Sequence, residues 1–506
     1  MNPSFNLIDQ PWIPCVTHEG ELAELSLRDL FQAAPRLRAI HCETPLMNAS
    51  IMPVLLAILH RVFGPGNVRQ WEQLWTEGHF SSDALDAYFE QWYERFDLFH
   101  PRRPFYQTRD SRCQNKSILD LAVVQSEGDI LFNHQTPDTK PYFTPNEAAR
   151  ALLVAHYFRS GGGRSGDKTP YFVDSIFKSG VIFFAQGKNL FETLMFNLMP
   201  YPSESFSGFR QLPDDKPVWE KDEPGHPQIA QMHVLPPKGY LDYLTWETNH
   251  IWLFPEQMEH ATVVREIQIV PAAKPIETLL SPQKRYIRKS KEGETSWSFL
   301  YFNKERALWR DYYSLLPNDS TDGIRPPLVV LWLARLNLGH DYPLRLQAVG
   351  MSSNQAKINF YRQEELPLPP ELLDGSHQLV VAEAINNADV TAEKLRSAVN
   401  ILADNVLMRG GSGKPDSSNR TNLTKQWDSL SLYWAELEPH FWTFVTGLVA
   451  GNPAAEDQWS SALVRSARTA LSQSEKMAGD SPWALKGGVA ARWYLNTELK
   501  KLFQPQ

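Results

Sequence analysis

The sequence predicts an α+β protein with a large mixed α/β domain over residues 1–370 and an all-α four-helix bundle over residues 371–506. Its 506 residues exceed the roughly 250–300 residues at which one core stops growing, so more than one domain is expected. Helical periodicity mixes with strand-like alternation before residue 370, whereas nearly all the later pattern is helical. The proline-rich run Leu366-Pro367-Leu368-Pro369-Pro370 lies at this change and predicts the domain boundary.

The first region is expected to hold several helices, near residues 25–33, 47–63, 68–76, 82–96, 144–158 and 190–198. Thr144-Pro145-Asn146-Glu147 is a strong start signal, because Thr can cap the helix, Pro suits its first turn and Glu completes a capping box. A short strand ending in a Pro-punctuated turn is expected within Phe5–Pro14. Residues 200–275 are rich in Pro, Trp and Asp and are expected to form strands and loops.

The second region shows apolar periodicity over residues 378–407, 422–450, 455–474 and 482–502. The breaks between these segments are short, and each contains Gly together with Pro or Asp. Four helices joined by short turns predict an up-down bundle with its own core.

Composition narrows the function classes. The net charge is −8, from 58 acidic and 50 basic residues, which argues against a surface covered with Lys and Arg but allows a local basic site. The three cysteines, Cys15, Cys42 and Cys113, are odd in number and widely spaced, so neither a disulfide framework nor a Cys-rich zinc site is expected. No signal peptide is expected at the N-terminus, and the apolar run 51–63 is too short and interrupted to span a bilayer. A cytoplasmic protein without a membrane contact and without a cofactor is predicted.

Two glycine-rich loops invite comparison with a phosphate-binding P-loop. In Gly166-Asp167-Lys168-Thr169 an acidic residue stands where the motif needs lysine, and the loop follows a helix rather than a strand. Gly413-Lys414-Pro415 lacks the hydroxyl residue and has Pro where a helix must continue. Neither loop is a nucleotide-binding P-loop. The triple glycine at 161–163 can still bring backbone N–H groups close to a nucleic-acid groove, because no Cβ intervenes; a flexible connector is the equal alternative.

The stretch Gly350–Ala356 lies between two predicted strands, 344–349 and 357–361. It would place the side-chain amides of Asn354 and Gln355 at the tip of a narrow loop. Amides carry both donors and acceptors without charge, so such a tip can enter a duplex groove or wedge at a base step. A plain solvated turn is the common alternative.

Signals for catalysis are weak. No HExxH or HxH motif occurs among the scattered histidines, so a metal site has little support. No GxSxG motif of a serine hydrolase occurs either. Residues 284–291 hold five cations in eight residues and could meet phosphates, or form a solvated hairpin. A second set of cations on the bundle could line a polyanion track, or be solvated: Lys414, Arg420, Lys425, Arg465, Arg468 and Arg492.

Several short motifs resemble motifs of one protein family, and they occur in the same order along the chain. They are Leu7-Ile8-Asp9-Gln10-Pro11-Trp12-Ile13-Pro14, Pro104-Phe105-Tyr106-Gln107, Leu131-Phe132-Asn133-His134, the triple glycine at 161–163, and Ser353-Asn354-Gln355-Ala356. Together with the length and the C-terminal bundle they resemble the CasA family, the large subunit of the type I-E CRISPR Cascade complex.

The resemblance implies a non-catalytic DNA-recognition subunit. Such a protein recognises the protospacer-adjacent motif in double-stranded DNA from the minor groove, promotes R-loop formation and recruits a helicase-nuclease. Its other partners would be the remaining Cascade subunits and the guide RNA. Gln355 would be the wedge, flanked by Asn354 and Ala356; Gly161, Gly162 and Gly163 would contact the motif through their backbone; Phe132 and Asn133 would belong to the first DNA-facing loop.

One family feature is missing. Family members can carry a lysine finger near a cysteine-rich hairpin, but the corresponding residues 256–262 contain neither lysine nor cysteine. Lys274 or the basic run 284–291 could substitute. A metal-dependent nucleic-acid-processing enzyme and a structural scaffold without DNA contact are the alternative functions.

Overall fold

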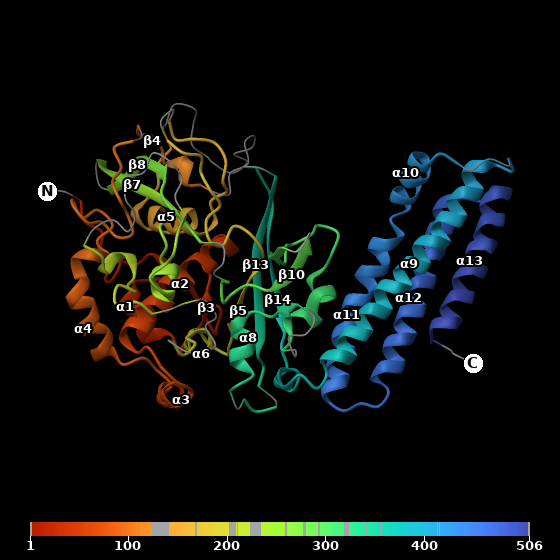
Figure 1. The fold of residues 1–506 in the computed structure, drawn as a ribbon, viewed down its shortest axis with the longest axis horizontal. Helices are drawn as coiled ribbons and strands as arrows, with labels where there is room; N and C mark the ends of the chain where they lie inside the picture. Colours follow the sequence, from red (N-terminus) through yellow and green to blue (C-terminus); the bar gives the residue numbers. More distant parts are fainter. Residues whose placement is uncertain are drawn as a thin grey trace. The chain divides into compact units, whose positions relative to one another are not determined.

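The computed structural model divides the chain into two compact units. Unit 1 comprises Met1–Phe302 and Asp319–Pro370, and unit 2 comprises Asn303–Asn318 and Glu371–Gln506. The structure describes all residues except 1–2, 113, 123–140, 167–168, 202–208, 210, 223–233, 259–260, 277–279, 292–293, 318–322, 337, 341, 355–356, 412, 414 and 504–506. Mixed α/β structure in unit 1 and helices in unit 2 confirm the predicted fold class (Figure 1).

Several helices of unit 1 begin where a polar side chain caps them, as Thr44 caps α2 and Asn67 caps α3. They are α1 (Leu27–Ala33), α2 (Pro45–Val62), α3 (Val68–Glu77), α4 (Ser82–Trp92), α5 (Pro145–Phe158), α6 (Leu190–Asn197), α7 (Tyr240–Leu244) and α8 (Leu328–Leu333), with 3-10 turns η1 (Tyr93–Phe96), η2 (Ile118–Leu121) and η3 (Val218–Glu220). The 3-10 turn η5 (Pro370–Asp374) starts at the last residue of unit 1 and continues into unit 2. The predicted capping box of α5 is present.

The strands of unit 1 form small sheets rather than one large sheet. Their orders are β2-β1-β3, β11-β10-β12, β14-β13-β5, β4-β8-β7 and β6-β9. The strands are β1 (Ile13–Thr17), β2 (Leu22–Leu25), β3 (Leu37–Ile40), β4 (Lys116–Ser117), β5 (Ile182–Gln186), β6 (Val234–Leu235), β7 (Asn249–Met258), β8 (Ala261–Pro271), β9 (Lys274–Pro275), β10 (Tyr286–Lys291), β11 (Glu294–Phe299), β12 (Ile324–Arg325), β13 (Arg345–Asn354) and β14 (Lys357–Pro367). The strand expected within Phe5–Pro14 begins only at Ile13, after a turn.

Helix α2 lies in the core of unit 1. Every residue from Ala49 to His60 is buried, including Pro53, whose missing N–H the surrounding core tolerates. By length and composition this helix could cross a membrane, but 72% of it is buried inside the protein, as in the core helix of a soluble protein.

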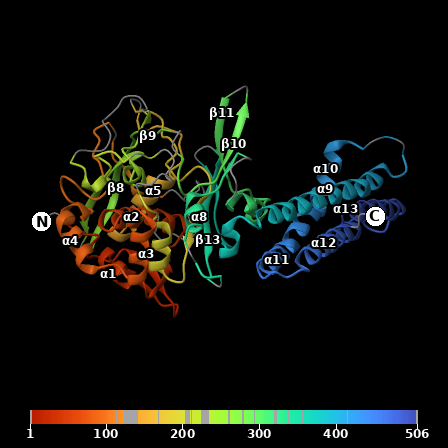
Figure 2. The same cartoon turned by 60° about the horizontal axis from the view of Figure 1, so that its bottom comes forward.

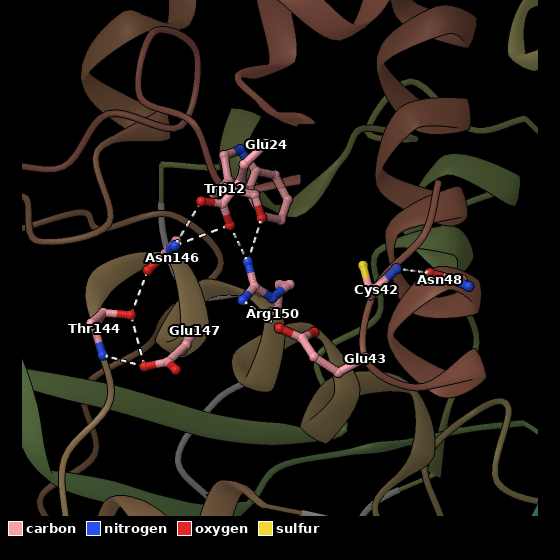
Figure 3. Close-up of polar contacts among 9 residues, drawn as sticks. All are labelled: Trp12, Glu24, Cys42, Glu43, Asn48, Thr144, Asn146, Glu147 and Arg150. Carbon is pink, nitrogen blue, oxygen red and sulfur yellow. Dashed lines mark hydrogen bonds and ion pairs between the residues drawn. The ribbon is translucent and has the colours of Figure 1, made fainter. Parts of the chain in front are cut away.

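The family-like motif Leu7–Pro14 has a structural role. Trp12 is fully buried, and its indole N–H donates to the carbonyl of Leu7 at 3.1 Å. Arg150 of α5 is 4% exposed and binds this region, donating to the Trp12 carbonyl at 2.9 Å and pairing with Glu24 at 2.6 Å and Glu43 at 2.8 Å (Figure 3). The buried guanidinium therefore joins four segments, and removing either carboxylate would leave it incompletely paired.

Unit 2 is a bundle of long helices whose apolar residues recur every three or four positions, as on α9, where Val381, Ile385, Leu395 and Leu402 are buried. Its helices are α9 (Gln378–Met408), α10 (Ser417–Trp427), α11 (Ser429–Val449), α12 (Ala455–Ala478) and α13 (Pro482–Phe503). Figures 1 and 2 show α9, α11, α12 and α13 side by side. The helix predicted over 422–450 is instead two helices, because Asp428 adopts a left-handed φ of 47° between α10 and α11.

A segment from the middle of the chain completes this bundle. The 3-10 helix η4 (Leu308–Leu315) lies in Asn303–Asn318, and its Trp309 stacks on Phe441 of α11 with ring centroids 4.7 Å apart. Arg310 lies over the ring of Trp434 at 3.5 Å and pairs with Asp389 of α9 at 2.5 Å. These contacts bury aromatic surface that neither segment could cover alone.

Candidate nucleic-acid interface

The hairpin of β13 and β14 carries the predicted wedge. Its register runs from Arg345 opposite Pro367 to Asn354 opposite Lys357, with an irregularity between Ser352 and Ser353. Strand β5 pairs with β13 only as far as Val349, so among the described strands the last five residues of β13 pair with β14 alone. At about 3.3 Å per residue this two-stranded ribbon extends roughly 15 Å beyond the sheet (Figure 1).

The base of the hairpin is rigidly packed. Leu346, Ala348 and Val349 are fully buried. Gly350 allows a close approach, since a Cβ there would lie 3.2 Å from the ring of Phe302 and 3.4 Å from the carbonyl oxygen of Gly180. A packed base fixes the direction in which the tip points, which a wedge requires.

The predicted residues at the tip are placed only in part. Asn354 is the last residue of β13, and its backbone pairs opposite Lys357, while its side chain is not described. Gln355 and Ala356 lie outside the described residues, as do Phe132 and Asn133 of the first loop. The two predicted strands are present, but the loop predicted over Gly350–Ala356 is wrong in its first five residues, because Gly350–Asn354 continue β13 and pair with β14. The roles of the tip side chains stay predictions.

The glycine loop pairs with a segment about ten residues further on. The N–H of Gly162 donates to the carbonyl of Phe172 at 2.8 Å, and the N–H of Phe172 donates to the carbonyl of Gly163 at 3.1 Å. Gly162 and Gly163 have φ values of 106° and 70°, which favour glycine. A Cβ on Gly161 would lie 3.0 Å from the Phe172 carbonyl oxygen, whereas a Cβ on Gly163 meets no described atom within 4 Å. The loop therefore has a packed side at Gly161 and an open side at Gly163.

Asp174 connects this loop to the hairpin. Its carboxylate accepts from the N–H of Gly161 at 2.7 Å, from Lys178 at 2.9 Å and from Ser179 at 3.0 Å. Burial raises the pKa of this carboxyl, but the hydrogen bonds from Gly161 and Lys178 outweigh burial and hold the pKa below its usual value. Ser179 precedes Gly180, which lies against Gly350 of β13. The predicted groove-binding loop and the predicted wedge are thus joined by a short path of contacts.

An arginine–tyrosine pair beside the glycine loop escaped the sequence analysis. Arg164 lies over the ring of Tyr171 at 4.1 Å, and the backbones of the two residues form an isolated bridge. Tyr171 is 59% exposed. A cation on an exposed aromatic ring is a common element of nucleic-acid surfaces. The sequence offers only the seven-residue separation of Arg164 and Tyr171, and such a separation does not predict a contact unless the fold of the loop is known.

The first two cations of the basic run 284–291 are buried, so they do not form the predicted phosphate-contacting surface. Lys284 and Arg285 are 4% and 3% exposed. The ammonium of Lys284 donates to the carbonyl of Ile176 at 2.7 Å and lies 4.8 Å from the centroid of the Phe299 ring. Burial lowers the pKa of Lys284 to about 7. Lys284 therefore cannot replace the missing lysine finger. Arg288 and Lys289 are exposed and remain candidates; they belong to β10, which forms a hairpin with β11 (Figure 2).

The hairpin of β7 and β8 occupies the position expected for that finger. Its turn, 259–260, lies outside the described residues. Near the turn, Glu256 pairs with Arg265 at 3.3 Å, and Met258 is 40% exposed. Lys274 is half-buried in β9, several residues beyond the end of β8.

Several cations predicted to line a track on the bundle have partners within it. Arg420 pairs with Asp404 at 3.4 Å, Arg492 pairs with Glu475 at 3.1 Å, and Arg468 donates to Asn496 at 2.9 Å. Arg465 and Lys425 are exposed, and Lys414 lies outside the described residues. The track stays a prediction, with less free charge than the sequence suggested.

In unit 1 one histidine pairs with an aspartate that is distant in the sequence. His250 and Asp110 are 140 positions apart, and the ring Nδ1 lies 2.8 Å from the carboxylate, with both side chains 1% exposed or less. Burial also lowers the pKa of His60 and of His156 to about 3. A group without access to solvent cannot exchange protons with a bound substrate, so these side chains serve the core. Among the described residues no three His, Cys, Asp or Glu side chains gather to hold a metal ion.

Comparison with known proteins identifies the family. The fold, a mixed α/β unit together with a helical bundle, matches that of CRISPR-associated proteins of known structure, and the family model of the CRISPR-associated protein Cse1 matches residues 6–470. The chain belongs to this family. The resemblance to CasA drawn from the short motifs is thereby confirmed.

Individual relatives match this chain over nearly all of their length. The chain is 28% identical over 498 residues to the CRISPR-associated protein CasA/Cse1 of Thermus thermophilus, covering 95% of this chain and 94% of the relative. A crystal structure of Thermus thermophilus CasA matches with a TM-score of 0.81 and 26% identity, over 99% of this chain and 100% of that one. A chain in a CRISPR RNA-guided surveillance complex matches in fold, with a TM-score of 0.76 and 24% identity over 98% of this chain and 100% of that one.

Proposed function

We propose that this protein is a non-catalytic subunit of an RNA-guided surveillance complex. In this role it recognises the protospacer-adjacent motif of double-stranded DNA from the minor groove, promotes R-loop formation and recruits the helicase-nuclease. Membership of the Cse1 family supports the assembly with other Cascade subunits and guide RNA. The observation that carries the DNA-binding part is the β13–β14 ribbon, which extends past β5 and ends beside Asn354.

The chemistry of the ribbon suits the minor groove. That groove mainly distinguishes A·T from G·C pairs, so it allows a permissive choice among related motifs. Guide pairing then supplies the specificity of the complex. Inserting a side chain at a base step costs a few kcal/mol of unstacking. The glycine loop, with its open face at Gly163 and the Arg164–Tyr171 pair, offers contacts that can offset this cost.

The test is Gln355→Ala in the assembled complex. R-loop formation on a relaxed duplex is expected to slow about tenfold, equivalent to about 1.4 kcal/mol. A negatively supercoiled target should hide most of this defect, because supercoiling itself favours opening.

Gln363→Ala is the matched control, since Gln363 lies in the same hairpin at its base, opposite Val349. It should leave both rates unchanged. Wild-type rates for Gln355→Ala on both targets would remove Gln355 from the mechanism.

The two alternative functions gain no support from the described residues. A metal-dependent nuclease requires a cluster of ligands, and a scaffold gives no reason for the projecting ribbon. Incubation of the purified chain with labelled DNA and magnesium or manganese separates the enzyme from the binding protein, because only an enzyme cleaves the DNA.

A further inference from the structure

A hollow of about 330 Å³ lies in unit 1 between the segment after η1, the residues after η3, and strand β7. This volume falls at the lower end of the range of about 300–1,000 Å³ that is typical of ligand sites. Five of its lining residues are cations and one is acidic: Arg95, Arg102, Arg103, Arg109, Lys221 and Asp222. Such an excess contrasts with the net negative charge of the chain.

The wall of the hollow is held in place before any ligand arrives. The N–H of Phe105 donates to the carbonyl of Asp97 at 3.0 Å, and the N–H of Thr108 donates to the carbonyl of Ile251 in β7 at 3.0 Å. Between them, the Gln107 side chain accepts from the N–H of Leu253 at 2.9 Å. The family-like segment Pro104–Gln107 thus fixes the backbone from which Arg102, Arg103 and Arg109 project.

The charges in the hollow are only partly neutralised. Lys221 pairs with Asp242, and both Arg95 and Arg103 donate to the same oxygen of Asp222, at 3.0 Å and 2.9 Å. Burial and the neighbouring charge of Arg103 lower the pKa of Arg95. Within the part of the chain that the structure describes, Arg102 and Arg109 have no carboxylate at ion-pair distance, and both are exposed.

An aromatic ring adjoins Arg109, one of these two arginines. Trp252 of β7 lines the hollow, and the guanidinium of Arg109 lies 5.8 Å from the centroid of its ring. Arginine forks bind phosphate oxygens through two parallel hydrogen bonds. Indole rings accept bases by stacking regardless of sequence. An acidic peptide would use the cations but not the flat ring.

We propose that this hollow binds one phosphodiester unit of a nucleic-acid strand, with Arg102 and Arg109 on the phosphate and the base against Trp252. The site is separate from the β13–β14 ribbon and the glycine loop, so it does not depend on the function proposed for them. Binding here acts through phosphate and stacking, and is therefore expected to be indifferent to sequence and sensitive to salt.

The test uses the purified full chain and fluorescein-labelled 15-nucleotide single strands of RNA and of DNA that lack any motif. Arg102→Glu combined with Arg109→Glu is expected to weaken binding at least tenfold and to lower the salt slope by about 0.7, since the two arginines share one phosphate and each neutralised phosphate contributes about 0.7 for a single strand. Arg36→Glu combined with Arg69→Glu is the matched control, because it changes the net charge equally at two exposed arginines of unit 1. The control should bind within twofold of the wild type.

A second readout locates the strand. A strand carrying 5-iodouridine should crosslink on irradiation to the peptide that contains Trp252, and the RNA and DNA arms show which strand is the better ligand. The double Arg→Lys variant at 102 and 109 keeps the charge and should still bind more weakly than the wild type, because lysine lacks the fork.

The proposal is overturned if the pocket variant and the control lose affinity equally, if the crosslink maps elsewhere, or if an acidic peptide binds this hollow while neither strand does. A wild-type chain that binds no strand at 50 mM salt overturns it as well. Each outcome is independent of R-loop formation, so it is distinguishable from a failure of the Gln355 test.

Discussion

Two glycine clusters each follow a helix: Gly161–Gly163 in unit 1 and Gly410–Gly411 in unit 2. They differ in how far along the sequence their backbone hydrogen-bond partners lie. Gly162 donates to the carbonyl of Phe172, whereas Gly411 donates to that of Met408, within a single turn. Gly163 has open space beside it, whereas a Cβ on Gly410 would lie 2.3 Å from the ring of Trp483 in α13. The first loop leaves a glycine face open to a ligand, while the second uses glycine to let a tryptophan pack. The role of a glycine cluster therefore depends on which atoms, if any, lie beside the missing side chains.

The largest effect is expected for Gly410→Ala. A φ of 89° strains an L-residue by about 1–2 kcal/mol. The new methyl group meets the outer edge of the Trp483 ring, which is 37% exposed, so turning the ring aside adds about 1 kcal/mol. We therefore expect the free energy of opening of α13, measured by hydrogen exchange of its amides, to fall by about 2–3 kcal/mol.

Gly413→Ala is the control for this variant. A Cβ there meets no described atom within 4 Å, so the change should stay within about 0.5 kcal/mol. Equal protection of α13 in the two variants would show that Trp483 moves aside freely, and the contrast between the loops would weaken.

A smaller effect is expected for Gly161→Ala. The new methyl group would press on the backbone of residues 172–174 at about 3.0 Å, and backbone cannot rotate away. Overpacking of this kind costs about 1–3 kcal/mol. Hydrogen exchange of the Phe172 amide should report the loss. Gly166→Ala should have no such effect, since the nearest described atom to its Cβ lies 3.9 Å away; similar losses in both variants would mean that the whole loop resists change.

The smallest effect concerns binding and rests on the proposed function. Gly162→Val, at a φ of 106°, should disturb the open face of the loop. The ratio of affinities for duplexes with and without the adjacent motif is expected to fall about three- to tenfold, or about 0.7–1.4 kcal/mol. Gly20→Val is the control, because Gly20 has a φ of 89° with open space in the turn between β1 and β2. An unchanged ratio for Gly162→Val would make the loop a connector, as Gly410–Gly411 is.

Local signals predicted much of the fold. The capping box at Thr144 located α5, and apolar periodicity located α9 and α13 to within one residue at their ends. These features depend on residues that lie within a few turns of each other. The break between α10 and α11 could not be predicted, because only the φ of Asp428 marks it.

Distant contacts account for the rest. Asn303–Asn318 packs in unit 2 through Trp309, although more than fifty residues separate it from the start of α9. For the candidate site, alternation predicted the base of the hairpin, but the continuation of β13 through Gly350–Asn354, the pairing of Gly162 with Phe172 and the burial of Lys284 follow from tertiary packing. Charge alone predicted that all of 284–291 lies at the surface, whereas Lys284 is buried against Phe299.

Because Lys284 is buried, the rate at which its amine is acylated can report how often this segment opens. Its amine is uncharged in a large share of molecules at neutral pH, because burial lowers its pKa to about 7, and an uncharged amine attacks acylating reagents. The contacts with Ile176 and Phe299 keep such a reagent out until this part of unit 1 opens. Exposed Lys289, five residues further on, is acylated without any opening. The ratio of the two modification rates therefore reports how often this segment separates from its neighbours, in the free chain and after assembly.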